Sequence, residues 1–148
     1  MEGKNDIEVF DASGKVLGRL ASTVAKRLMH GNEVVIANAS KAIISGDRKV
    51  IAARYKTRLD LLEKENPEHS PYWSRRPDML VKRIVRGMLP YRLPKGKAAY
   101  RRLKVYIDAA PELKNAKRVD MESKNPRTIY AGHVTVGELS RMLGYDRK

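Results

Sequence analysis

Cysteine is absent from this chain of 148 residues, and long apolar runs are absent as well. Without thiols the chain can form neither disulfide bonds nor thiolate metal sites, and a reducing compartment suits it. No window approaches the roughly 18 consecutive apolar residues that a membrane-spanning helix needs. The opening residues MEGKNDIEVF lack an apolar run after a basic start, so they do not have the pattern of a signal peptide. We therefore expect neither a membrane span nor a secretion signal.

Histidine is scarce. His30, His69 and His133 stand alone, and none has another histidine or a carboxylate at the spacing of metal ligands. Because catalytic and zinc sites need several converging side chains, we assign these three to structural or surface positions. The sequence therefore predicts no enzyme, no metal and no cofactor.

Acidic residues are depleted in one segment only. The chain carries 31 Lys and Arg against 17 Asp and Glu, a formal net charge of +14. Residues 69–107, called the basic segment below, hold 11 basic side chains and one acidic, while residues 1–68 and 108–148 each have a net charge of only +2. Within the basic segment, residues 82–104 contain nine basic side chains and no acid. A solvated surface normally mixes both signs, so this composition predicts binding to a polyanion.

The first third of the chain alternates between strand and helix patterns. Residues 7–12 alternate like a short strand, and residues 34–38 form the apolar run typical of buried parallel strands. Between them, apolar residues recur at helical spacing from Leu17 to Leu28, and Gly31 stands where a left-handed C-cap would end the helix. This order indicates an α/β domain with right-handed crossovers.

A further strand and a second helix continue this pattern. Residues 41–45 fit the strand, and Asp47 is placed to begin the helix. The inward face of this helix would hold Ile51, Tyr55, Leu59 and Leu62.

The basic segment predicts a third helix with two unlike faces. Residues 66–77 contain three prolines and are expected to form a loop, and Pro77 suits the first helical turn. On a helical wheel one sector is apolar, with Leu80, Val81, Ile84, Val85 and Met88. The opposite sector is basic, with Lys82, Arg83 and Arg86. Such a helix packs one side on a core and presents a basic stripe outward.

Prolines 90 and 94 separate this helix from a short fourth one at residues 96–103. Its inward residues would be Ala99, Tyr100 and Leu103, and its outward residues Lys97, Arg101 and Arg102. Residues 104–108 return to strand character, and residues 109–132 look irregular.

The last helix has a start signal. Thr135 and Glu138 have the spacing of a capping box, and Val134 and Leu139 that of a hydrophobic staple. The helix is expected to end at Gly144.

Residues 13–22, SGKVLGRLAS, place glycines between a strand and a helix, where some proteins bind phosphate. They match neither G-x-G-x-x-G nor G-x-x-x-x-G-K-[ST], and Asn38 stands where the dinucleotide fold expects an acid. The structural alternative is that Gly14 serves a turn and Gly18 permits close helix–sheet packing. A small nucleotide-using α/β enzyme stays open as the weakest alternative.

Aromatic residues near the basic segment, Tyr72, Trp73, Tyr91 and Tyr100, can stack on unpaired bases. Tyr100 shares the inward face of Ala99 and is expected in the core. Tyr72 and Trp73 are better candidates for base stacking, with a purely structural position left open. Gly87 equally fits the end of a helix or a point where phosphate approaches the backbone.

Three partners are weighed for the basic stripe: water alone, a membrane surface and nucleic acid. A membrane-surface helix needs a free apolar face, whereas this one is committed to the core. Short helices and proline-broken loops suit irregular RNA better than a DNA groove. We therefore predict RNA as the partner.

The run RPDMLVKRIVRGMLPYRLPKGKAAYRRLKVY, residues 76–106, closely resembles the signature of the large-subunit ribosomal protein L-thirteen family. DASGKVLGRLAS at residues 11–22, VVIANASKAIISGDRK at 34–49 and HVTVGELSRMLG at 133–144 extend the resemblance to about residues 7–145. Bacterial members usually carry G-x-x-H-P after the last strand, whereas IDAAPE stands here. This departure, with the V-T-x-G-E ending, points to the archaeal–eukaryotic branch.

The resemblance implies a single domain over residues 1–148, a three-layer α/β/α fold on a small, mostly parallel sheet with a basic extension. It implies a non-catalytic, cytoplasmic component of the large ribosomal subunit that contacts ribosomal RNA and neighbouring ribosomal proteins and joins early in assembly. Carried over by position, the phosphate-neutralising residues are Arg75, Arg76, Lys82, Arg83, Arg86, Arg92, Lys95, Lys97, Arg101 and Arg102. Arg48 and Lys49 are added as less secure contacts. A free RNA-binding translational regulator that binds mRNA is the alternative function.

Overall fold

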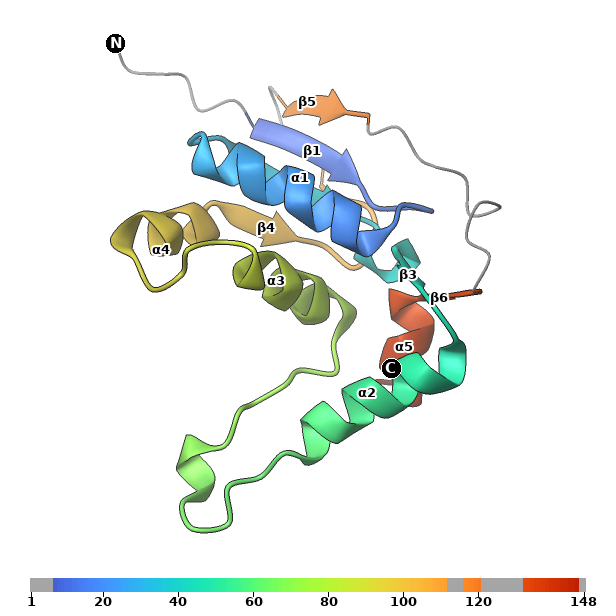
Figure 1. Cartoon of the computed structure of the whole chain (residues 1–148). Helices are drawn as coiled ribbons and strands as arrows, with labels where there is room; N and C mark the ends of the chain where they lie inside the picture. Colours follow the sequence, from blue (N-terminus) through green and yellow to red (C-terminus); the bar gives the residue numbers. More distant parts are fainter. Residues whose placement is uncertain (1–6, 112–115, 121–131, 147–148) are drawn as a thin grey trace.

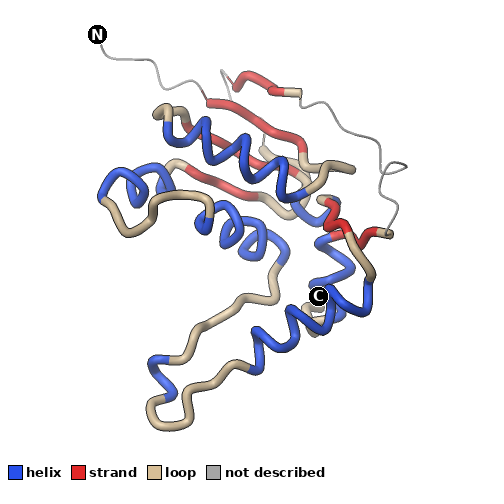
Figure 2. Tube along the Cα trace, in the orientation of Figure 1, coloured by secondary structure: helices blue, strands red, loops and turns tan. Residues whose placement is uncertain are grey.

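The computed structural model describes residues 7–111, 116–120 and 132–146. Figure 1 and Figure 2 show the order of elements along the chain. The strands are β1 (Ile7–Asp11), β2 (Glu33–Ala37), β3 (Ile43–Ser45), β4 (Leu103–Val105), β5 (Ala116–Val119) and β6 (His133–Thr135). The helices are α1 (Leu17–Met29), α2 (Arg48–Asp60), α3 (Pro77–Gly87), α4 (Pro94–Arg101) and α5 (Val136–Met142), with single 3-10 turns at Ala39–Lys41 and Pro67–His69.

Four strands form one parallel sheet in the order β4-β2-β1-β5. Val9 of β1 aligns with Val35 of β2. Because β2 lies between β4 and β1, its buried apolar run is at the middle of the sheet. β3 and β6 pair antiparallel in a separate small sheet. The α/β class and the mostly parallel sheet predicted from the sequence are confirmed.

The helices occupy two places around these sheets. α1, α3 and α4 lie over one face of the parallel sheet, whereas α5 and the start of α2 lie beside the small sheet (Figure 1). The rest of α2 and the loop that follows it extend away from the other elements as an arm. Within the described part of the chain, no helix is both long and apolar enough to cross a bilayer.

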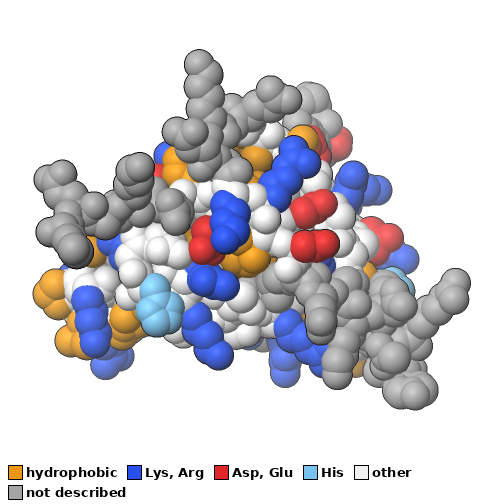
Figure 3. Space-filling model, turned by 90° about the horizontal axis from the view of Figure 1, so that it is seen from above, with side chains coloured by type: hydrophobic (Ala, Val, Ile, Leu, Met, Phe, Trp, Pro, Cys, Tyr) orange, Lys and Arg blue, Asp and Glu red, His pale blue; other side chains and the backbone are white. Residues whose placement is uncertain are grey.

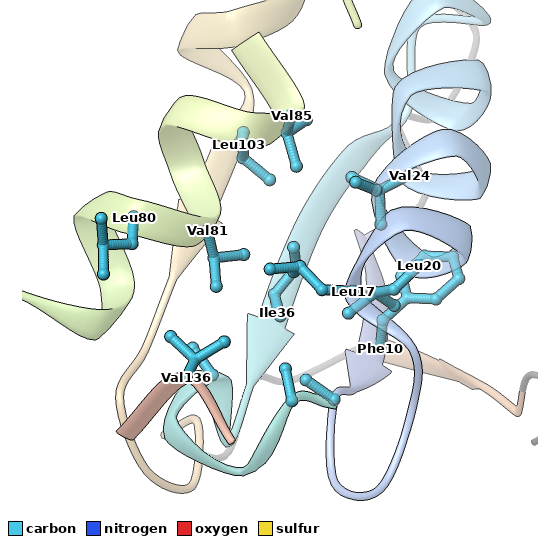
Figure 4. Packing of buried hydrophobic residues seen from close by; sticks show 14 of the residues in the cluster. Phe10, Leu17, Leu20, Val24, Ile36, Leu80, Val81, Val85, Leu103 and Val136 are labelled. Carbon is cyan, nitrogen blue, oxygen red and sulfur yellow. The ribbon is translucent and has the colours of Figure 1, made fainter. Parts of the chain in front are cut away.

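One hydrophobic cluster holds these elements together. Phe10 and Ile36 from the sheet, Leu20 from α1 and Val81 from α3 are fully buried and meet between the sheet and the helices (Figure 4). The apolar residues that recur at helical spacing along α1 are all buried, namely Leu17, Leu20, Ala21, Val24, Ala25 and Leu28. On α3 the same holds for Leu80, Val81 and Val85, while Ile84 is partly buried. The periodicity of apolar residues therefore correctly predicted which side of α3 faces outward.

Two residues predicted to be inward are exposed, and that prediction was wrong. Met88 is 43% exposed, because α3 ends at Gly87 and the next residue already belongs to the cap. Leu62 is 68% exposed, because α2 ends at Asp60 and the chain leaves the core there.

Two further expectations change. Residues 116–119, placed in an irregular segment, form β5 at the edge of the parallel sheet, paired with β1; residues 112–115 and 121–131 lie outside the described part. Gly18 sits on the exposed side of α1, and a Cβ there would meet open space, so it is not needed for close helix–sheet packing.

The predicted helix ends are confirmed where they rest on caps. The Asp47 side chain accepts a hydrogen bond from Lys49 N at the start of α2. Thr135 and Glu138 form the capping box of α5, with both reciprocal bonds present. Gly31 and Gly144 have positive φ after α1 and α5, in the region that favours glycine.

Candidate nucleic-acid interface

The outer side of α3 is the centre of the basic surface. Pro77 occupies the first turn, and burial of Leu80, Val81 and Val85 fixes the rotation of the helix about its axis. Because a helix turns by about 100° per residue, Lys82 and Arg86 then project from the side opposite the core. The predicted basic stripe is therefore present on this helix.

Arg83 joins α3 to the preceding loop. Its Nη1 donates a hydrogen bond to the Tyr72 carbonyl oxygen at 2.6 Å, and its Cζ lies 3.9 Å from the centre of the Trp73 ring. Arg58 of α2 also lies over Trp73, at 4.9 Å, and over Tyr55, at 5.0 Å. The three contacts with aromatic rings are cation–π interactions. Through its two arginine partners, Trp73 connects α2 and α3 to the loop between them.

A second group of stacked side chains follows on the same helix. The Arg86 Cζ lies 4.0 Å from the centre of the Tyr91 ring, and Lys82 Nζ lies 5.2 Å from that of Tyr100. The two tyrosine rings meet at right angles with their centres 5.4 Å apart. Tyr100 is only partly buried, so it joins this group and also packs against the core. Burial raises its pKa above the ordinary value.

Carboxylates are nearly absent from this surface. Among the described residues there are three ion pairs, Lys15–Asp120, Arg27–Glu8 and Arg76–Asp78, and only the last lies in the basic segment. Asp78, the one acid of the segment, is thus engaged by Arg76, at 2.9 Å. Burial, followed by the neighbouring charges of Arg86 and Arg58, lowers the pKa of Arg83. The cations on α3 repel one another, and none of them forms an ion pair with a carboxylate of the described residues.

A surface hollow lies between these cations and the turn that joins α3 to α4. Its lining consists of Trp73, Arg83, Arg86, Gly87, Leu89, Pro90, Tyr91, Arg92 and Leu93. Arginine provides the charged part of the lining, and the exposed backbone of Gly87 provides a part without a side chain. The hollow is open to solvent, and every charged side chain in its lining is an arginine, so an anionic group that enters it meets only positive charge.

The position of α4 depends on a glycine that the sequence did not single out. A Cβ on Gly96 would overlap the Pro90 carbonyl, so only glycine lets α4 pack on the turn. Lys95 and Lys97 of α4 are exposed, and so is Arg92 on the turn that precedes the helix. Arg101 is exposed at the end of the same helix.

Arg102 is placed differently from the other predicted contacts. Its Nη2 donates to the Leu28 carbonyl oxygen at 2.8 Å, and its Nε is buried without a hydrogen-bond partner among the described residues. A cation at this carbonyl stabilises the C-terminal end of α1. Arg102 thus has a structural contact on the protein itself.

The remaining predicted contacts are spread more widely. Arg48 and Lys49 are exposed at the start of α2, beside α5, whereas α4 lies across the molecule (Figure 1). Arg75 is exposed, and its Nη1 lies close to Gly144 after α5. Tyr72 is 83% exposed, in contrast to the partly buried Trp73. The structure therefore groups the contacts of α3, α4 and their turn and separates Arg48 and Lys49 from them.

One residue of this surface was missed by the sequence interpretation: Arg58 of α2, which stacks on Trp73. Tyr91 was considered for base stacking, but its contact with Arg86 was not predicted. The signal for Arg58 was its position three residues after Tyr55, which places both on one side of a helix. The contact with Trp73 is tertiary and left no pattern in the sequence.

The loop between β1 and α1 does not have the character of a phosphate site. Gly14 has a positive φ and forms a turn, as predicted. Lys15 Nζ pairs with Asp120 at 3.1 Å, which leaves its charge engaged. Burial alone would raise the pKa of Asp11, but hydrogen bonds from Ser13 and Asn38 together with the Lys15 charge lower it, so that carboxyl is ionised. Two carboxylates at the end of these strands disfavour an anionic ligand.

Other parts of the surface mix both signs of charge. Figure 3, which looks at the molecule from above, shows Asp and Glu side chains among Lys and Arg on that face. Among the described residues no cluster of three or more His, Asp and Glu is arranged to hold a metal ion. The depletion of acid is thus a local property of the basic segment.

The model of the family Ribosomal protein L13 matches residues 5–112. This chain belongs to that family. A relative named large ribosomal subunit protein uL13, from Methanosphaera stadtmanae, is 45% identical over 139 residues, which cover 93% of this chain and 97% of the relative. The protein of the same name from Archaeoglobus fulgidus is 41% identical over 143 residues, covering 95% and 90%. That from Thermoplasma acidophilum is 37% identical over 138 residues, covering 93% and 98%.

Family membership confirms the resemblance inferred from residues 76–106, and these archaeal relatives agree with the branch inferred from IDAAPE. The family is one of ribosomal proteins, which are structural components and not enzymes. The nucleotide-using enzyme considered for residues 13–22 is therefore excluded by the family as well as disfavoured by the local charges.

Proposed function

We propose that this chain binds ribosomal RNA in the large ribosomal subunit through the basic segment, and that it joins the subunit early in assembly. The observation that carries the proposal is the set of cations on α3, the following turn and α4, which have a single carboxylate among them, already engaged by Arg76. Folded RNA brings many phosphates close together, and its charge density matches such a surface.

The phosphate contacts proposed first are those that are exposed and share this surface. They are Arg86, Arg92, Lys95, Lys97 and Arg101. Lys82 and Arg83 share this surface and are proposed as contacts too, although they are partly buried. Arg75, Arg76, Arg48 and Lys49 are proposed as outer contacts, because they are exposed but lie away from the centre or carry a partner. Arg102 is the weakest contact of the set, because its guanidinium is bonded to α1.

Early assembly is supported by the way the chain folds. A single hydrophobic cluster of its own side chains joins α1, α3 and the sheet, so the basic surface is formed before RNA is bound. A preformed surface needs no partner to order it. The order of joining is tested by pulse labelling, in which this chain should enter the smallest precursor particles and not only the mature subunit.

The location is tested by sedimentation of tagged protein from cell lysate. A component of the large subunit, bound to ribosomal RNA and to neighbouring ribosomal proteins in the cytoplasm, should sediment with that subunit. A pool that stays at the top of the gradient and co-purifies with mRNA would instead support a free translational regulator. Reversal of Arg92 and Lys97 to Glu should release the protein from the subunit if the basic segment holds it there.

A further inference from the structure

Two aromatic rings of the basic surface, those of Trp73 and Tyr91, are already stacked against arginine side chains of the protein. Arg83 and Arg58 lie over Trp73, and Arg86 lies over Tyr91 at 4.0 Å, a distance at which a guanidinium takes the place of a stacking base. The Tyr91 ring also contacts Tyr100 edge-on. The sequence suggested Trp73 as a platform for bases, but its surroundings suit another task.

Stacking leaves the hydrogen-bonding edge of a guanidinium available. Five N–H donors lie in the plane of this group, so a ring against its face holds the plane still without using any donor. Arg83 uses one Nη1 hydrogen on the Tyr72 carbonyl oxygen, and the described residues supply no acceptor for Arg86. Both side chains line the same hollow, together with Arg92 and the open backbone of Gly87.

From this geometry we infer that Trp73 and Tyr91 are positioning residues, which hold Arg83 and Arg86 as a preformed site for one phosphate of the RNA backbone in the hollow. The inference rests on the proposed RNA binding and adds the ligand group and the role of each ring. A bound phosphate places negative charge between cations that otherwise repel one another, and the fixed guanidinium planes lose little conformational freedom on binding.

The inference differs from base stacking in one measurable respect. If Tyr91 acts through Arg86, removing the ring and removing the planar guanidinium damage the same interaction, so their effects on RNA affinity are not additive. If Tyr91 contacts a base directly, the two effects add. The double-mutant cycle therefore uses Tyr91→Leu and Arg86→Lys, of which the second keeps the charge but not the planar fork.

The experiment measures equilibrium binding of the full chain to a fragment of large-subunit RNA over a series of salt concentrations. Each single variant is expected to lose about tenfold in affinity, and the double variant little more than either single one. In all three variants the slope of log K against log salt should stay as in the unchanged protein, because neither substitution removes a charge. Tyr91→Phe, which keeps the ring face, should bind like the unchanged protein.

Tyr72→Leu with Arg86→Lys is the matched control cycle. The Tyr72 ring is exposed, and no guanidinium lies over it among the described residues, so its effect should add to that of the lysine substitution. Circular dichroism and melting of every variant confirm that the fold is kept. The same cycle made with Trp73→Leu and Arg83→Lys checks the second ring.

Additive losses for Tyr91 and Arg86 would overturn the positioning role while leaving RNA binding in place. A failure of the proposed function would look different, because Arg86→Ala and Arg92→Ala would then leave RNA affinity and its salt slope unchanged. If both alanine variants weaken binding and flatten the slope, a result from the cycle bears on the positioning role alone.

Discussion

The position of the positive charge, and not its amount, should decide RNA affinity. The test compares two double reversals, Arg92→Glu with Lys97→Glu in the basic segment and Arg19→Glu with Lys26→Glu on α1. Each lowers the formal net charge from +14 by four, to +10. All four side chains are exposed, and none takes part in the ion pairs of the described residues. Arg27 is unsuitable as a control because it lies 3.6 Å from the buried carboxylate of Glu8.

The expected size of the effect follows from Coulomb's law. Opposite unit charges about 4 Å apart attract by about 1 kcal/mol in bulk water, and reversal turns this attraction into a repulsion of similar size. Two reversals at phosphate contacts therefore cost about 4 kcal/mol, which salt reduces, since the screening length is about 8 Å at physiological ionic strength. We expect a loss of at least about 100-fold for Arg92 with Lys97 and of only a few-fold for Arg19 with Lys26.

Fluorescence anisotropy of labelled large-subunit RNA at a fixed salt concentration measures both affinities. Thermal melting and circular dichroism check that both double variants keep the fold, which the exposure of the four side chains predicts. Equal losses for the two pairs, with both folds intact, would show that RNA responds to the overall charge, and the assignment of the basic segment as the docking surface would be wrong.

Three further outcomes follow from individual contacts. Gly96→Ala should destabilise the protein by about 1–3 kcal/mol or more, because its Cβ would overlap backbone atoms. Gly87→Ala should be neutral or slightly stabilising, because a Cβ there meets open space. Similar melting temperatures for the two variants would contradict this. Lys97→Ala should lower the slope of log K against log salt by about one unit, and an unchanged slope would remove this residue from the contacts. The hydrogen bond from Thr135 N lowers the pKa of Glu138 below its ordinary 4.5, so the stability that the carboxylate supplies is present above pH 4.5 and lost as pH falls through the lowered value. Glu138→Gln should therefore flatten the loss of stability as pH falls below about 4.5, and Thr135→Ala should cost about 1 kcal/mol at neutral pH.

Local patterns made the helices predictable. The spacing of apolar residues identified the buried faces of α1 and α3, and the capping residues placed the starts of α2 and α5. These features depend on residues within one or two turns of each other, which is the range over which a sequence pattern is informative.

Features that depend on distant partners were not predictable. β5 is a strand because it pairs with β1, and its four residues, two of them basic, carry no apolar alternation of their own. Arg102 faces inward because the Leu28 carbonyl lies beside it, 74 residues earlier in the chain. Trp73 was considered for base stacking, with a structural position left open, and the sequence could not show that Arg58 and Arg83 lie over its ring.

The sequence therefore predicted which segment forms the candidate site, but not how its side chains are arranged in space. The lack of acid between residues 79 and 104 marked α3, α4 and their turn as a basic surface, and the structure keeps most of those cations exposed. The hollow, the stacked guanidinium groups and the packing of Gly96 on the turn depend on tertiary geometry, which charge counts do not contain.

Chemical footprinting of lysines tests docking through the basic segment most directly. Amines are methylated in the free protein and in purified large subunits, and mass spectrometry measures the extent at each lysine. Lys95, Lys97 and Lys26 are all exposed in the free chain, so each should react readily there. Docking through the basic segment predicts strong protection of Lys95 and Lys97 in the subunit and far less protection of Lys26. Protection of Lys26 with Lys95 and Lys97 as reactive as in the free protein would contradict it.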